Sequence, residues 1–275
     1  MPADFSYDPV TAVDEKSATG ATADIFADIR DVMGIPLVTS IWRGLAGMDD
    51  SLAQAWRATR PIYLHGEPDR ALARIVEQAE LPRPEALAPT QLACAGISKE
   101  DLSHIRTIIH AYNRSNGMNL VALSALIAPA APKSGIPSAM VAPRWPEFPQ
   151  LLAREALSDD TWDLIRHVNA FGAPSLDANV ATLWRHLGHW PSLLSLIHAG
   201  LAPLQARGEV ELATSRMVEA TQAEAVTLAA WRELDAPLID VIGAGAMTTV
   251  TGYVTTKTQV VRMVTLGHIL ARWLA

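Results

Sequence analysis

Apolar side chains recur along this sequence at the spacing of an amphipathic helix, and this periodicity limits the folds open to the chain. Three stretches place apolar residues at positions i, i+3, i+4 and i+7. They are Val38, Ile41, Trp42 and Leu45; Ile105, Ile108, Ile109 and Tyr112; and Leu266, Ile269, Leu270 and Trp273. Such spacing puts each set on one face of an α-helix. The alternation typical of strands is absent, so the sequence predicts an all-α fold.

A proline-rich segment divides the chain near its midpoint. Six of the 18 prolines lie between Pro129 and Pro149, a density that helix interiors do not tolerate. We therefore expect residues 129–149 to form an extended surface connector. It would join a first helical repeat at 1–128 to a second at 150–275.

The two halves share short sequence matches in the same order, at offsets of 136 to 142 residues. The matched segments are Ile29-Arg30 with Ile165-Arg166, Gly34-Ile35-Pro36 with Gly172-Ala173-Pro174, Trp42-Arg43 with Trp184-Arg185, and Tyr112 with Tyr253. The rise in offset from 138 to 142 places a four-residue insertion in the segment 175–180. This pattern predicts two tandem repeats packed as a pseudo-dimer with a cleft between them.

Charge and composition exclude several classes of protein. Twenty-two Lys and Arg residues against 29 Asp and Glu give a net charge of −7, which argues against nucleic-acid binding. The single cysteine, Cys94, excludes intramolecular disulfides and cysteine-based zinc sites. No signal peptide is visible, and no apolar stretch reaches the roughly 18 residues of a membrane span. We expect a cytoplasmic protein with no membrane partner.

The histidines and glycines predict no metal or cofactor. His186 and His189 lie at i, i+3, and Asp101-x-x-His104 has the spacing of a carboxylate-bridged metal motif. The two Glu-x-x-His motifs and extra glutamates of a ferritin-like site are missing, which favours solvated or core histidines. Gly243-Ala244-Gly245 is typical of a helix break and does not form a phosphate-binding loop.

Three features are candidates for a ligand site. Trp42 and Trp184 are either equivalent packing residues or the walls of an apolar cleft between the repeats. The polar segment from Tyr112 to Gly117 is either a helix end or a helix that carries Asn113 and Asn116 inward on one face. Asp177, in the insertion, is either a helix N-cap or a general base at the mouth of the cleft.

These residues and several short motifs resemble the group I 2-haloacid dehalogenase family. The matching stretches are ADIFADIR at 23–30, IP and RGLA within 35–46, AWR at 55–57, AYN at 111–113 with Asn116, GAP at 172–174, and WP at 190–191. The resemblance implies an all-α pseudo-dimer with its active site between two repeats. It also implies hydrolysis of 2-haloalkanoic acids of either hand by direct attack of water. In the family a loop aspartate of the second repeat activates the water, and an asparagine of the first repeat helps to place it or the substrate.

Residue by residue, the resemblance assigns Asn113 to the family's asparagine and Tyr253 to an active-site tyrosine. Counting back from Trp190-Pro191 puts the family's Ser-Asp pair on Thr182 and Leu183. Two aromatic residues that wall the family's pocket fall on Leu37 and Ser40. Anchoring on Gly172-x-Pro174 instead puts the aspartate opposite Asp177. Leucine cannot take a proton from water, so Asp177 is the stand-in base, and the two alignments stay open.

Two functions follow from this reading of the sequence. The first is hydrolysis of a small 2-halo carboxylic acid in a cleft lined by Trp42, Tyr112, Asn113, Asn116, Thr182, Trp184 and Tyr253, with Asp177 as the base. The second is a non-hydrolytic protein on the same scaffold that binds a small acid or an apolar ligand. Both name a small-molecule carboxylic acid as partner, and a homodimer is a candidate assembly.

Overall fold

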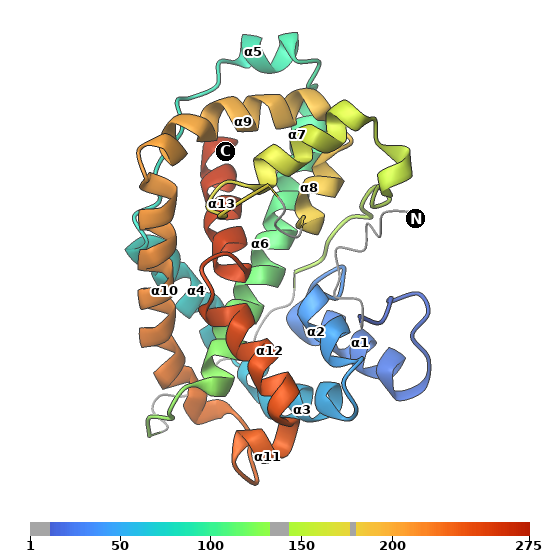
Figure 1. Cartoon of the computed structure of the whole chain (residues 1–275), viewed down its shortest axis with the longest axis vertical. Coiled ribbons are helices and arrows are strands. Elements are labelled where there is room, and N and C mark those ends of the chain that lie inside the picture. The colour runs from blue at the N-terminus through green and yellow to red at the C-terminus, as the bar shows by residue number, and fades with distance from the viewer. Residues whose placement is uncertain (1–11, 133–142, 177–179) are drawn as a thin grey trace.

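The computed structural model describes residues 12–132, 143–176 and 180–275, which form helices and contain no strand (Figure 1). The helices of the first half are α1 (Gly20–Met33), α2 (Ser40–Leu45), α3 (Ser51–Leu64), α4 (Glu67–Gln78), α5 (Pro89–Cys94) and α6 (Lys99–Ile127). Those of the second half are η1 (Arg154–Ala156), α7 (Asp159–Asn169), α8 (Thr182–Leu187), α9 (Pro191–Ala206), α10 (Glu209–Leu228), η2 (Ala229–Trp231), α11 (Leu238–Ile242), α12 (Ala244–Thr255) and α13 (Val260–Trp273). The all-α prediction is confirmed.

Helix α6 runs through the middle of the molecule (Figure 1). It begins with a capping box, in which the Ser98 hydroxyl accepts from the Asp101 N–H and the Asp101 carboxylate accepts from the Ser98 N–H, both at 3.0 Å. Every residue from 117 to 126 is buried, so this part of the helix needs neighbours on all sides. Helices α3, α4, α10, α12 and α13 supply them.

The polar segment from Tyr112 to Gly117 lies inside α6. The interpretation of Asn116-Gly117 as a helix end is therefore wrong, and the continuing helix is confirmed. Gly117 is tolerated because it faces Leu72 of α4, whose methyl groups occupy the space that a Cβ atom would need. A glycine at this position thus marks close helix packing and does not end the helix.

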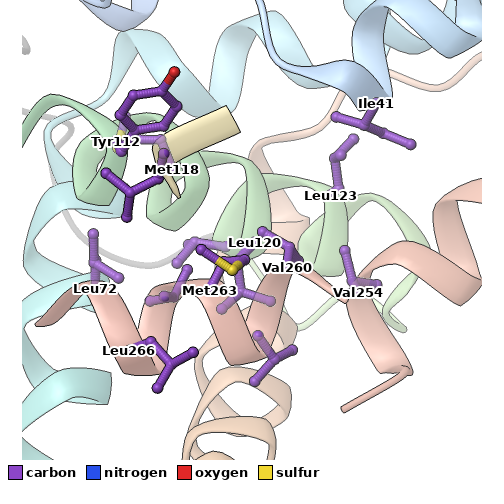
Figure 2. Close-up of a cluster of buried hydrophobic side chains, with 14 of the residues drawn as sticks. Ile41, Leu72, Tyr112, Met118, Leu120, Leu123, Val254, Val260, Met263 and Leu266 are labelled. Carbon is purple, nitrogen blue, oxygen red and sulfur yellow. The ribbon is translucent and has the colours of Figure 1, made fainter. Parts of the chain in front are cut away.

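The most extensive contact of α6 is with α13. Figure 2 shows side chains of both helices in one buried cluster, among them Leu120 of α6 and Met263 of α13. The helices come close together where Gly267 of α13 faces Asn113 of α6, since a Cβ atom at Gly267 would collide with the Asn113 side chain. The two helices can approach this closely because Gly267 has no Cβ atom.

The described parts of the connector, residues 129–132 and 143–149, contain no helix. The second part is attached to both halves of the chain. Trp145 donates its indole N–H to the carbonyl of Gly34 at 2.8 Å, and the Pro149 carbonyl lies 3.1 Å from Nε2 of His186. One indole N–H and one backbone carbonyl thus attach this part of the connector to the rest of the molecule.

We expect Gly267→Ala to destabilise the protein by about 1–3 kcal/mol, because the added methyl group forces α13 away from Asn113. Gly245→Ala is the matched control. Gly245 is an exposed residue in the first turn of α12 with open space around its missing Cβ. The control should be neutral or stabilising by about 0.5–1 kcal/mol, because alanine favours the helix. Urea unfolding of both variants tests this, and equal effects would contradict the packing argument.

Candidate functional site

A cavity of about 800 Å³ lies where the two halves of the chain meet. The first half contributes α2, the segments before it and one face of α6. The second half contributes α8, α12, the turn that follows α12, and the start of α13. Helix α2 packs against α12, and α8 packs against α6. Each short Trp-Arg helix therefore contacts the opposite half and brings its residues to the shared cavity.

Four residues predicted from the sequence line this cavity: Tyr112 and Asn116 of α6, Thr182 of α8, and Tyr253 of α12. Three further positions that the family resemblance marked also line it, namely Leu37, Ser40 and Leu183. Leu183 is only 1% exposed. It belongs to the core and to the cavity wall at once.

Trp42 and Trp184 are core residues, and neither lines the cavity. Both are 0% exposed. The Trp42 indole N–H donates to Oδ1 of Asn119 at 2.8 Å, and its ring meets Trp56 edge to face at 5.4 Å between centroids. The sequence placed both indoles in the cleft, but at this cavity the same two stripes contribute Ile41 and Leu183 instead.

Asn113 also lies outside the cavity wall. It is 4% exposed and faces α13 beside Gly267. Its Nδ2 has no hydrogen-bond partner within the part of the chain that the structure describes. One turn further along the helix, Asn116 presents its amide to the cavity. Asn116 therefore lines the cavity, and Asn113 lies behind the cavity wall.

Asp177, the predicted base, lies outside the described residues. Of the carboxylates that are described, Asp14 and Glu15 line the cavity. Glu15 is bound on both of its oxygens, since Oε2 pairs with Arg30 at 2.7 Å and Oε1 accepts the Val38 N–H at 2.8 Å. Glu15 therefore fixes the segment before α2, and both of its carboxylate oxygens already have partners.

His186 is the cavity residue that the sequence did not single out for function. It is 5% exposed, with Nδ1 2.7 Å from the Tyr112 hydroxyl and Nε2 3.1 Å from the Pro149 carbonyl. Because a carbonyl can only accept, Nε2 carries the hydrogen, and burial, which lowers the His186 pKa to about 4, keeps the ring neutral. Nδ1 then accepts from the Tyr112 hydroxyl. A core-satisfied histidine was expected, and this network explains why.

The network continues from Tyr112 to Thr182. The two side chains are hydrogen-bonded, and burial raises the Tyr112 pKa, so its phenol stays protonated. Since the phenol hydrogen points to His186, Thr182 must donate to the phenol oxygen. The remaining lone pairs of Tyr112 and Thr182 are hydrogen-bond acceptors. This wall of the cavity is suited to a ligand or water that offers hydrogens.

Two arginines line the cavity, Arg43 of α2 and Arg262 of α13. Arg262 is 2% exposed and donates to the carbonyl oxygens of Asn169, Phe171 and Thr258. Burial lowers its pKa to about 10, so it remains a cation near neutral pH. The cavity therefore has positive charge on two walls, as well as the acceptor oxygens of Tyr112 and Thr182.

No metal centre is apparent where side chains can be placed, because no three His, Cys, Asp or Glu residues gather there. The helices within the same ranges are too short or too polar to cross a membrane.

Comparison with known proteins connects this geometry to one group of enzymes. No family model matches the chain. A configuration-inverting 2-haloacid dehalogenase of Pseudomonas sp. (strain 113) is 25% identical over 74% of this chain and 71% of its own. A solved D-2-haloacid dehalogenase in complex with L-LA superposes with a TM-score of 0.77 at 15% identity, over 96% of both chains. A D-2-haloacid dehalogenase mutant gives 0.76 at 15% identity, over 96% of this chain and 95% of its own.

The solved structures show that the chain has the all-α fold of the D-2-haloacid dehalogenases. Sequence and fold together support its resemblance to the group I 2-haloacid dehalogenase family.

The buried His186 should make the stability depend on pH. Its folded pKa of about 4 lies below the usual histidine value of 6.5, so only the unfolded chain takes up this proton between those values. The free energy of unfolding should therefore fall as the pH drops from 6.5 to 4, by up to about 3 kcal/mol. His186→Gln should flatten this dependence in urea titrations at pH 7 and 4.5. A variant with the wild-type slope would contradict the assignment.

Proposed function

We propose that the protein hydrolyses small 2-halo carboxylic acids in the cavity between its halves. Water attacks C2, a C–O bond forms, and the carbon–halogen bond breaks with its electron pair leaving on the halide. One water proton passes to a base, and the product is the 2-hydroxy acid. The Pseudomonas relative supports a hydrolytic, dehalogenase-like function.

One observation carries this proposal. Of the six described positions that the family resemblance assigned from sequence alone, five line a single cavity, namely Leu37, Ser40, Thr182, Leu183 and Tyr253, and Asn113 lies behind its wall. The five come from three separate segments of the chain, so a common cavity is not a consequence of nearness in sequence. A pocket of this kind between packed helices is a usual place for a small ligand.

The residues of the cavity suit distinct tasks in this reaction. Tyr112 and Thr182 present acceptor oxygens that can hold the attacking water, and Asn116 and Tyr253 provide polar contacts from two other helices. The apolar side chains of Leu37 and Leu183 would limit bulk water around C2. Asp177 is the proposed base, and desolvation in such a cleft would raise its pKa toward the range in which a base works.

A second function is favoured by Leu183. The residue lines the cavity at the position that the Trp190-Pro191 alignment gives to the family's aspartate. If Asp177 does not replace that carboxylate, the same scaffold would bind a small acid or apolar ligand without hydrolysing it.

We also propose that the halves are repeats, 1–128 and 150–275, joined by 129–149 and related by a pseudo-twofold axis. Their matched contacts support this. Helix α1 packs on α3 as α7 packs on α9, and α2 contacts α12 as α8 contacts α6. The pairs α4 with α10 and α6 with α13 would then lie across the axis.

Chloride release from each enantiomer of 2-chloropropionate tests the hydrolysis. We expect the wild type to release chloride and Asp177→Asn to lose roughly 100-fold or more of that rate, because the base is gone. Asp14→Asn is the matched control, since Asp14 is an exposed carboxylate that lines the same cavity. It should stay close to the wild type. No chloride release by the wild type would leave the binding function.

Leu183→Asp separates the two functions. Under the proposed hydrolysis a carboxylate at this 1% exposed position is a buried charge, and it should cost several kcal/mol of stability without raising chloride release. Leu183→Asn is the control, because asparagine has nearly the same shape as aspartate and no charge. Faster chloride release by the aspartate variant alone would instead show a scaffold that has lost its base at this site.

A further inference from the structure

Arg262 of α13 is a buried arginine that donates to backbone carbonyls. Its Nε donates to the Thr258 carbonyl at 3.2 Å, and Nη1 donates to the carbonyls of Asn169 and, at 3.2 Å, Phe171. All three acceptors are neutral backbone groups. The hydrogen bonds hold the guanidinium in one orientation but leave its charge uncompensated.

Throughout the described ranges, no carboxylate forms an ion pair with Arg262. More exposed arginines do have such partners: Arg30 pairs with Glu15 and Arg74 with Glu224, each at 2.7 Å. A buried charge without a counter-ion is costly, and proteins normally pair it. Burial lowers the Arg262 pKa to about 10, and no anion among the described residues opposes that effect. An anion from outside would be stabilised here.

The place of Arg262 makes such an anion a ligand. The residue lines the cavity together with Thr258, Gln259, Val260 and Met263 at the start of α13. Helix α13 has 14 residues, no acidic side chain in its first turn and no side-chain cap. Its first N–H groups and its positive dipole end thus add to the field of the guanidinium on this wall.

We propose that Arg262 anchors the carboxylate of the ligand, with the start of α13 as the carboxylate subsite. This inference rests on the proposed function, because it names the group that would hold the acid. The backbone carbonyls occupy Nε and Nη1 of the guanidinium, so Nη2 is the nitrogen whose hydrogens can be donated to a ligand carboxylate. The ligand class is then a small monocarboxylate, and an uncharged amide or ester of the same shape is excluded.

The test compares propionate with propionamide, which has nearly the same shape and no charge. Neither carries a halogen, so binding is measured apart from the reaction, as the shift of the melting temperature. The wild type should bind propionate and discriminate against the amide. Arg262→Gln should weaken propionate binding by about 10- to 100-fold and lose the discrimination. Arg43→Gln is the matched control and should still discriminate between propionate and propionamide.

The outcomes separate the two proposals. Propionate binding that depends on Arg262, without chloride release from 2-chloropropionate, would overturn the hydrolysis and leave the anchor in place. Discrimination that survives Arg262→Gln would overturn the anchor, whatever the chloride assay gives. A wild type that binds acid and amide equally would overturn it as well.

A second pair of variants tests the anchor even if Arg262→Gln does not fold. Met263 follows Arg262, is 8% exposed and lines the same cavity. Met263→Glu and Met263→Gln have similar shapes and differ in charge. At pH 7 and low salt, the glutamate variant should have the higher melting temperature and no longer respond to propionate, because its carboxylate occupies the subsite. A lower melting temperature than the glutamine variant, the usual result for a buried carboxylate, would overturn the anchor.

Discussion

The contact between α6 and α13 is the constraint on which the rest of the molecule depends. These helices come from opposite halves of the chain, and they approach closely because Gly267 leaves room for the Asn113 side chain. Their packing fixes where Tyr112 and Asn116 of α6 face Arg262 and Met263 of α13 across the cavity. The site is thus a product of the interface between the halves. A separate half would carry only part of its walls.

The polar part of the site is organised by directional hydrogen bonds. The Pro149 carbonyl accepts from His186, His186 accepts from Tyr112, and Tyr112 accepts from Thr182. Each step follows from the one before, because a carbonyl has no hydrogen to donate. Across the cavity, the fixed cation of Arg262 offers the opposite chemistry. A ligand with an anionic end and a hydrogen-donating neighbour, such as a carboxylate with an attacking water, matches both walls.

Periodicity in the sequence was enough to predict an all-α fold and the apolar faces of α2, α6 and α13, because spacing alone puts such residues on one face of a helix. The family resemblance located the cavity positions Thr182 and Tyr253. Periodicity could not decide between a buried indole and a cavity wall for Trp42, since both face inward from the same stripe. Arg262 left no signal in the sequence. That it has no counter-ion among the described residues depends on which side chains surround it, and a short motif does not encode that.

The connector between the halves also has chemical consequences for the cavity. Its Pro149 carbonyl selects which nitrogen of His186 is protonated, and the choice passes to Tyr112 and Thr182. A change in the length of this segment could withdraw the carbonyl without altering any side chain of the site. The imidazole could then adopt its other tautomer, and the phenol would point its hydrogen into the cavity. A change in the connector backbone could therefore alter which hydrogen-bonding groups the cavity offers, while every residue of the cavity walls stays the same.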